Sequence, residues 1–398
     1  MPPTLNAGHG RTRRNPGEAG SVILLVLMTL LLTAFALTKY LEKTTVDLLA
    51  DARDVRAERL RVEAYSALET TLAVLQEFRT VDGGLYNPTE GWGAPLDFAG
   101  YAPPEGLVVE AAIEDESGKI SLPHADFQTL RDLFLLFDLK QSDAERLADA
   151  LLVWMQQGYE PVDSFSARAT DYERAALPHD PPARSLHSFS ELAAIQFVRD
   201  LLYDDQGRPN DLWRRFADSV SLYDFTQPNL NSARDTTLAA LGSYDVTSIK
   251  MITDYLGGLG SYTRQGPAYF RTSQDVAGLV GQAAMSSRLG TQVRCLRITV
   301  TVREGSTSFR VSAVVAPPGG ASLPPADAPN AATSSGTPTT NQNSSGTNAS
   351  GNTASATTSA STTSTQTQPS LNYPFTLLEI RENDEIVVAA APSQSAST

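Results

Sequence analysis

The sequence predicts an α+β protein, in which a long N-terminal helix crosses a membrane and continues into a domain whose antiparallel sheet is interrupted by a large all-helical insert. Three observations predict this fold class. An apolar run at residues 21–37 leads into an amphipathic stretch without glycine or proline. Alternating, strand-like segments lie on both sides of a long middle region, and that middle region has helical spacing.

The first element is one unbroken helix, expected from Ser21 to about Arg79. A bilayer core about 30 Å thick needs roughly 20 apolar residues. The run supplies seventeen, and residues 38–41 extend it if Lys39 reaches to the interface. Beyond the membrane, apolar residues recur at steps of three, four and seven, which is the spacing of one helix face. They are Leu41, Leu48, Ala52, Val55, Val62, Tyr65, Leu68, Leu72 and Leu75.

Three arginines before the apolar run, Arg11, Arg13 and Arg14, predict the orientation of the helix. By the positive-inside rule they hold the N-terminus in the cytoplasm, so the rest of the chain is expected outside the inner membrane. A secretory signal peptide would have a shorter apolar centre and small residues at a cleavage site after it, which residues 39–43 do not supply. A plain signal anchor on an unrelated periplasmic protein remains an alternative.

A glycine-rich and proline-rich loop is expected after the helix, at residues 83–104. Residues 106–122 then read as a β-hairpin, with residues 107–113 as its first strand and Ile120 and Leu122 in its second. Asp115 and Glu116 are interpreted as polar residues of the hairpin turn.

Helical patterns fill residues 124–290. Leu130, Leu133, Phe134 and Phe137 form one apolar stripe. Two capping boxes are predicted, Ser142 with Glu145 and Ser188 with Glu191, each opening a helix. Residues 229–258 are expected to form two short helices around a turn.

Strands return near the C-terminus. Apolar residues alternate on both sides of a turn at residues 304–306, namely Ile298, Val300 and Val302 before it and Phe309, Val311, Ala313 and Val315 after it. Residues 317–370 are rich in Ser, Thr, Asn and Ala and are expected to be disordered, because they cannot bury enough surface to offset their ordering entropy. A last strand is expected within residues 373–383. We interpret the disordered stretch as an expanded hairpin loop, since lengthening a connection from about 5 to about 54 residues costs only roughly 2 kcal/mol.

The N-terminus resembles the type IV pilin and type II secretion pseudopilin superfamily: a short basic leader ends at Gly20, and an apolar helix continues into a soluble domain. The resemblance implies cleavage after Gly20 by a prepilin peptidase, which leaves Ser21 as the first mature residue. The family usually has Phe at that position and Glu at the fifth, where this chain has Leu25. A carboxylate in hydrocarbon is costly unless it is paired, so a subunit with Leu25 suits a filament tip, with no subunit above it.

Several further stretches resemble one family of minor pseudopilins, general secretion pathway protein K. They are IEDESGKISL, LADALLVWMQQ, PPARSLHSFSEL, PNLNSARDTTLAAL and FTLLEIREN, and their order along the chain is more specific than any one of them. The predicted organisation is a leader (1–20), a transmembrane and amphipathic helix (21–81), a loop and the first strands of a pilin-like sheet (82–123), a helical insert domain (124–290), further sheet strands (291–316), a disordered loop (317–370), and a last strand and tail (371–398).

The resemblance implies a non-enzymatic function: a minor pseudopilin at the tip of the secretion pseudopilus, which helps to initiate and cap the filament that drives export across the outer membrane. The implied partners are other minor pseudopilins, the prepilin peptidase, the inner membrane and possible secreted proteins. Filament assembly would use Leu25, Leu41, Leu48, Val55 and Val62. Two alternatives remain, a membrane-anchored periplasmic enzyme and a minor pilin of a type IV pilus or DNA-uptake system.

Other chemistry has little support in the sequence. HExxH, CxxC, GxSxG and dinucleotide-binding motifs do not occur, and Cys295 is the only cysteine. A net charge of −14, or −16 once residues 1–20 remove three arginines and one glutamate, argues against a nucleic-acid surface. No cofactor is expected. A calcium site is a weak alternative, and its candidate ligands are Asp163, Asp171, Glu173 and Asp180.

Overall fold

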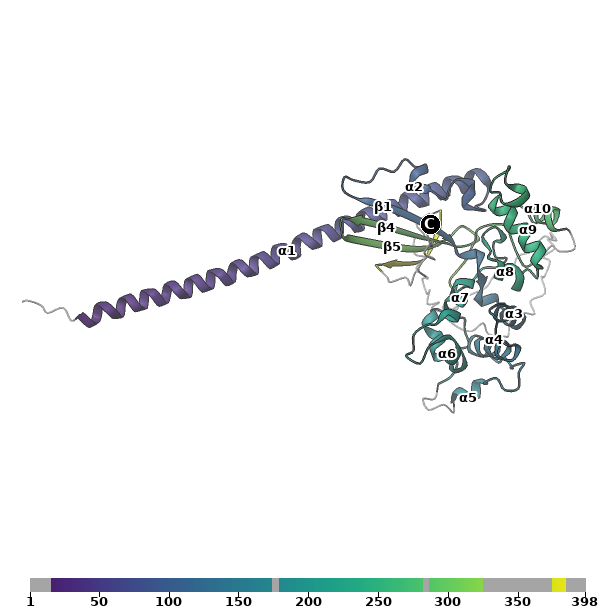
Figure 1. Cartoon of the computed structure of the whole chain (residues 1–398), viewed down its shortest axis with the longest axis horizontal. Coiled ribbons are helices and arrows are strands. Elements are labelled where there is room, and N and C mark those ends of the chain that lie inside the picture. Colours follow the sequence, from purple (N-terminus) through teal and green to yellow (C-terminus); the bar gives the residue numbers. More distant parts are fainter. Residues whose placement is uncertain (1–15, 174–178, 282–285, 325–373, 384–398) are drawn as a thin grey trace, which may run out of the picture. The chain divides into compact units, whose positions relative to one another are not determined.

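The computed structural model describes residues 16–173, 179–281, 286–324 and 374–383, and it has the predicted α+β architecture (Figure 1). A long helix comes first, a four-stranded antiparallel sheet is built from segments near both ends of the domain, and a helical insert lies between these segments in the sequence. The chain divides into two compact units, Met1–Val62 and Glu63–Thr398.

Helix α1 (Pro16–Asp82) is continuous over 67 residues, so its length is about 100 Å at ~1.5 Å per residue. The prediction of one unbroken helix is therefore confirmed, with bounds a few residues wider than Ser21–Arg79. Proline is tolerated in the first turn of a helix, where its missing N–H has no partner to lose. The helix ends where Gly83 takes a φ of +75°, a left-handed conformation that suits glycine.

The last turns of α1, within the second unit, pack into the domain. Ala64, Ala67, Leu68, Val74 and Leu75 are buried there, at the spacing of one helix face. Two tyrosines add polar contacts: Tyr65 donates to Glu382 Oε1 at 2.7 Å, and Tyr101 donates to Glu63. Of the predicted stripe, Leu68 and Leu75 are buried here, whereas its residues up to Val62 are exposed.

Four strands form the sheet in the order β1-β4-β5-β6, with every pair antiparallel. Their bounds are Val108–Asp115 for β1, Leu296–Glu304 for β4, Thr307–Ala316 for β5 and Thr376–Glu382 for β6. The predicted alternation in β4 is confirmed, because Ile298, Val300 and Val302 are fully buried. Strand β6 pairs with β5 as expected for a hairpin with an expanded loop; of that loop, residues 325–370 lie outside the described residues.

The predicted hairpin at residues 106–122 is wrong. Strand β1 pairs with β4, and the short strand β2 (Ile120–Ser121) pairs in parallel with β3 (Val220–Ser221) instead of returning along β1. The physical reason is burial: Ile120 and Leu122 belong to the apolar core of the insert, so the chain crosses from the sheet into the insert at this point. Between the strands, a single 3₁₀ turn covers Glu116–Gly118.

One apolar cluster, from Ile120 to Leu289, forms the core of the insert. Leu130, Leu133 and Phe134 lie in it as the stripe predicted, and the capping box of Ser188 and Glu191 is confirmed. The capping box of Ser142 and Glu145 is wrong, because the helix begins two residues earlier than that box would place it and has Lys140 as its N-cap. The helices are α3 (Phe127–Leu136), α4 (Gln141–Met155), α5 (Ala169–Glu173), α6 (Gln196–Leu202), α7 (Asp211–Ser219), α8 (Asp235–Ala240), α9 (Val246–Gly257) and α10 (Ser273–Val280). Helices α8 and α9 match the pair expected within residues 229–258.

The predicted loop at residues 83–104 carries two short helical turns, Pro88–Glu90 and α2 (Pro95–Phe98). Trp92 lies between them and is fully buried, and its indole N–H donates to Glu90 Oε2 at 2.7 Å. A buried indole needs such an acceptor, and this contact within the loop supplies it.

Candidate functional site

The predicted assembly residues of α1 are all exposed. Leu25, Leu41, Leu48, Val55 and Val62 have between 56% and 72% of their surface accessible. The last four follow one another at steps of seven and therefore share one face of the helix. From Val22 on, the helix is long and apolar enough to cross a membrane, with a mean hydropathy of 2.3 in its most apolar window. Gly20 and Ser21 lie inside α1.

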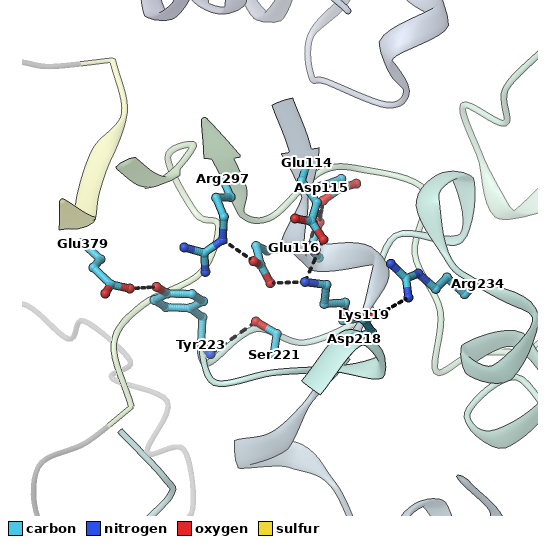
Figure 2. A network of polar contacts seen from close by, with 11 residues as sticks. Glu114, Asp115, Glu116, Lys119, Asp218, Ser221, Tyr223, Arg234, Arg297 and Glu379 are labelled. Carbon is cyan, nitrogen blue, oxygen red and sulfur yellow. Dashed lines mark hydrogen bonds and ion pairs between the residues drawn. The ribbon is translucent and has the colours of Figure 1, made fainter. Parts of the chain in front are cut away.

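A second candidate site is a polar junction where the sheet meets the insert, built around residues 114–119 (Figure 2). Glu116 is its centre. One carboxylate oxygen accepts from Arg297 Nε at 2.6 Å, and the other lies 3.0 Å from Lys119 Nζ. Lys119 also pairs with Glu114 at 2.8 Å. Because the side chain of Glu116 is only 5% exposed, its ion pairs with Arg297 and Lys119 are shielded from water, whereas the Glu114 side chain is 50% exposed.

The charges at the junction support one another. Burial alone would raise the pKa of Glu116, but the positive charges of Lys119 and Arg297 outweigh it and hold that pKa below its ordinary value. Burial would likewise lower the pKa of Lys119, but Glu116 and Glu114 outweigh it and raise that pKa. Both groups are therefore charged at neutral pH, and the buried Glu116 carboxylate lies between two cations.

Asp115 connects the junction to the insert. One of its oxygens accepts from the backbone N–H of Ser117 at 2.9 Å, and the other accepts from Asn229 Nδ2 at 2.7 Å. Burial raises the pKa of Asp115, and hydrogen bonds from Ser117, Ser232 and Asn229 oppose that rise only in part. The carboxylate is thus held by neutral donors, not by a cation.

Two buried asparagines extend these contacts. Asn229 also donates to the Tyr86 carbonyl at 2.8 Å, and its own backbone N–H donates to the Ser117 carbonyl at 2.7 Å. Asn231 donates to the carbonyls of Phe270 and Thr291 and accepts from the Phe270 N–H. A buried amide that satisfies several backbone groups at once fixes the segments that carry them.

Gly118 permits a close backbone approach at the junction. A Cβ at this position would lie 2.5 Å from the Ser232 carbonyl oxygen, which is closer than real Cβ atoms come to any heavy atom. Only glycine fits there without a shift of the backbone.

On the opposite side of Arg297, the junction reaches β6. Tyr223 donates its phenolic hydrogen to Glu379, and Ser121 donates to the Tyr223 carbonyl at 2.9 Å. Tyr223 and the buried Cys295 belong to a small apolar cluster that also includes Val314 of β5. Burial raises the pKa of the Cys295 thiol well above its ordinary value, so this cysteine is a protonated, unreactive thiol.

A pocket of about 320 Å³ opens beside the junction, lined by Asn87, Asp115, Lys119, Asn231 and Arg234 among others. Its charged groups already have partners within the protein: Lys119 pairs with two glutamates, and Arg234 lies 3.3 Å from Asp218. The arrangement therefore serves to join the sheet to the insert.

The weak calcium candidates do not converge in the part of the chain that the structure describes. Asp163 accepts from the Phe165 N–H, Asp171 accepts from the Arg168 N–H, and Asp180 is exposed. Glu173 is the last residue of α5. No group of three or more His, Cys, Asp or Glu side chains placed to hold a metal occurs among the described residues. Calcium binding thus stays a prediction.

Sequence reasoning placed Asp115 and Glu116 in a hairpin turn and missed their role in the junction. Their partners Asn229 and Arg297 lie more than 100 residues away in the sequence, so no local pattern indicates the pairing. The available signal was the IEDESGKISL stretch itself, because three acids and a lysine around a glycine are more charge than a simple hairpin turn requires.

Comparison with known proteins gave a family match and a structural match. Residues 111–205 match the family model described as type II secretion system (T2SS), protein K. Among solved structures, a chain of the GspK-GspI-GspJ complex from the type 2 secretion system of enterotoxigenic Escherichia coli is similar, with 13% sequence identity and a TM-score of 0.46. The alignment covers 69% of this chain and 96% of that one. The search of curated proteins found no match.

Proposed function

We propose that the chain belongs to the family of type II secretion system protein K, whose model matches residues 111–205, and that it is a minor pseudopilin at the tip of the secretion pseudopilus. Proteins of this family are structural components of the secretion system. In this proposal the chain helps to initiate and cap the filament whose extension drives proteins through the outer membrane, and it catalyses no reaction.

The observation that carries the proposal is α1. This 67-residue helix exposes apolar residues from Val22 to Leu41. So large an apolar surface is unfavourable in water, so lipid or other helices must cover it. Lipid can cover the first part of this surface. Beyond Leu41, the exposed face that carries Leu48, Val55 and Val62 fits the helices of other pseudopilins, which we propose as the partners.

Leu25 supports a place at the filament tip. In the pilin superfamily a glutamate at the fifth mature position is thought to meet the N-terminal amine of a neighbouring subunit. A subunit with Leu25 forgoes that partner and avoids the cost of an unpaired carboxylate in hydrocarbon. The helical insert, held to the sheet by the polar junction, supplies bulk that would block the addition of a further subunit.

The same reading places the domain in the periplasm and assigns the cytoplasmic leader to a prepilin peptidase. The mature N-terminus tests it: intact-mass measurement of the protein extracted from inner membranes should show the loss of residues 1–20 and Ser21 as the first residue. Expression in cells that lack the prepilin peptidase should leave residues 1–20 in place. A membrane-anchored enzyme would keep residues 1–20 in both cases, and that outcome would contradict the proposal.

A further inference from the structure

A second pocket, of about 390 Å³, lies in the insert between α4, α5, α6 and the segment that joins α4 to α5. These three helices gather at the end of the insert away from the sheet (Figure 1). The volume is within the range of small-molecule sites. The polar junction described above does not involve any of the residues that line this pocket.

Arg146 of α4 gives the pocket its positive charge. Its guanidinium lies over the ring of Phe197 from α6, 4.1 Å from the ring centroid. Arg146 Nε is buried and has no hydrogen-bond partner among the described residues. A guanidinium stacked on an aromatic face keeps its N–H donors in its own plane, so the ring fixes the group without satisfying its donors.

Ser166 adds a second donor without a partner. The residue is only 7% exposed, yet its hydroxyl has no hydrogen-bond partner within the described part of the chain. A buried hydroxyl left without a partner is costly, and native proteins rarely keep one without a reason. Arg146 and Ser166 both line the same pocket, and each has a buried donor atom without a protein acceptor, which an acceptor-rich ligand would supply.

The rest of the lining defines what kind of acceptor fits. Asp171 and Asp200 also line the pocket and would repel a polyanion such as a phosphate ester. They would instead favour a ligand whose carboxylate carries a positive charge nearby. Phe165, with 82% of its surface exposed, and Phe197 offer apolar faces for the remainder of the ligand.

We propose that this pocket binds an α-amino acid with an aromatic or large apolar side chain. The carboxylate accepts from Arg146 and Ser166, the ammonium group faces Asp171 and Asp200, and the side chain packs on Phe165 and Phe197. The same chemistry is available from a free amino acid and, without the ammonium, from the C-terminal residue of a polypeptide. This inference is independent of the assembly function proposed above.

Equilibrium dialysis of the full-length protein in detergent micelles tests the proposal, with empty micelles as the reference for non-specific partition. The probes are L-phenylalanine, L-phenylalaninamide, which lacks the carboxylate, and an N-acetylated tripeptide that ends in phenylalanine. Saturable binding of L-phenylalanine is expected, and the amide should bind at least about tenfold more weakly because the charge-assisted hydrogen bonds are lost. If the tripeptide binds more tightly than the free amino acid, the source is a polypeptide C-terminus; the reverse order indicates the free amino acid.

Three variants locate the binding. Arg146→Gln should weaken it at least about tenfold and Ser166→Ala about threefold, while Arg208→Gln, an exposed arginine elsewhere in the insert, should leave it unchanged. Thermal unfolding followed by circular dichroism shows whether each variant folds. If Arg146→Gln does not fold, Ser166→Ala alone tests the proposal. The proposal is overturned if no carboxylate probe binds saturably, if the amide binds as well as the acid, or if folded Ser166→Ala and Arg146→Gln proteins bind like the wild type.

Discussion

Arg297 of β4 donates to Glu116 at 2.6 Å and thereby joins the end of β1 to a strand 181 residues further along the chain. Lys119 completes the ion-pair network from the other side of the same carboxylate. Buried charges of this kind are costly to separate, because removing one leaves the others shielded from water without a partner. The junction is therefore the place where single substitutions should have the largest effect on the domain.

Glu116→Gln should destabilise the domain by about 3 kcal/mol, because it leaves Arg297 and Lys119 without their shared counter-charge. The matched control is Glu114→Gln. The Glu114 side chain is 50% exposed and its ion pair with Lys119 is open to solvent, so the expected loss is below about 1 kcal/mol. Urea unfolding followed by tryptophan fluorescence measures both. Equal losses of unfolding free energy for the two variants would show that the buried ion pairs of Glu116 stabilise the domain no more than the exposed pair of Glu114 does.

The contribution of Glu116 to stability should depend on pH. Its pKa in the folded state lies below the ordinary value of 4.5, so the folded protein favours the ionised form. This stabilisation is fully present above about pH 4.5 and is lost as the pH falls through the folded-state pKa. Asp115 acts in the opposite sense, because its pKa is raised.

Comparison of the wild type with Glu116→Gln isolates the effect, since both proteins contain Asp115. The difference in Tm between them should be largest near neutral pH and should shrink below pH 4.5. A difference that stays constant down to pH 3 would contradict the assignment.

Gly118→Ala should cost about 1–3 kcal/mol, because the new methyl group would meet the Ser232 carbonyl and force the backbone apart. Gly278→Ala, in α10, is the control. A Cβ there meets no atom within 4 Å, and alanine is a better helix former than glycine. We expect that variant to be more stable than the wild type by up to about 1 kcal/mol. Thermal unfolding of the two purified variants decides, and a harmless Gly118→Ala would refute the close approach.

Cross-linking can test the assembly face of α1. Because Cys295 is the only cysteine and is fully buried, a cysteine introduced on α1 would be the one reactive thiol on the described surface. Leu48→Cys should give bismaleimide cross-links to neighbouring pseudopilins, each carrying one introduced cysteine on its own helix, in intact membranes. Ala50→Cys lies about 200° further round the helix and should give far fewer. Similar yields at both positions would mean that no single face makes the contacts.

Shortening the connection between β5 and β6 should stabilise the sheet slightly. Replacing residues 325–370 by a four-residue Gly-Ser linker reduces the loop that must close when β6 pairs with β5. The entropy gain is about 1 kcal/mol if the long segment is flexible. Urea unfolding of the shortened protein measures it, and a marked loss of stability would show that the removed residues make contacts of their own.

The features predicted correctly from the sequence are those whose signal is local. An unbroken helical pattern defined α1, and strict alternation around Gly305 defined β4 and β5, because each pattern reflects the face that its own residues bury. The capping box at Ser188 is equally local. In each case the neighbours along the chain already contain the information.

The errors concern contacts between distant segments. Ile120 and Leu122 alternate as they would in a hairpin, but their burial is supplied by the insert, and no short window of sequence shows which partner a strand will choose. Asp115 and Glu116 look like turn residues for the same reason. Whether Leu25, Leu48 and the related residues of α1 serve assembly is a property of the filament and stays a prediction.

The way the chain enters and leaves the insert has a mechanical consequence. Ser117 bonds to Cys295, Asn229 bonds to Ser117, and Leu230 bonds to Gly290, so the incoming and outgoing segments are fastened to one another at one place. An insert whose two connecting segments did not contact one another could rotate relative to the sheet under an applied force. This one should instead transmit an applied force directly into the sheet, as the proposed place at a filament tip would require.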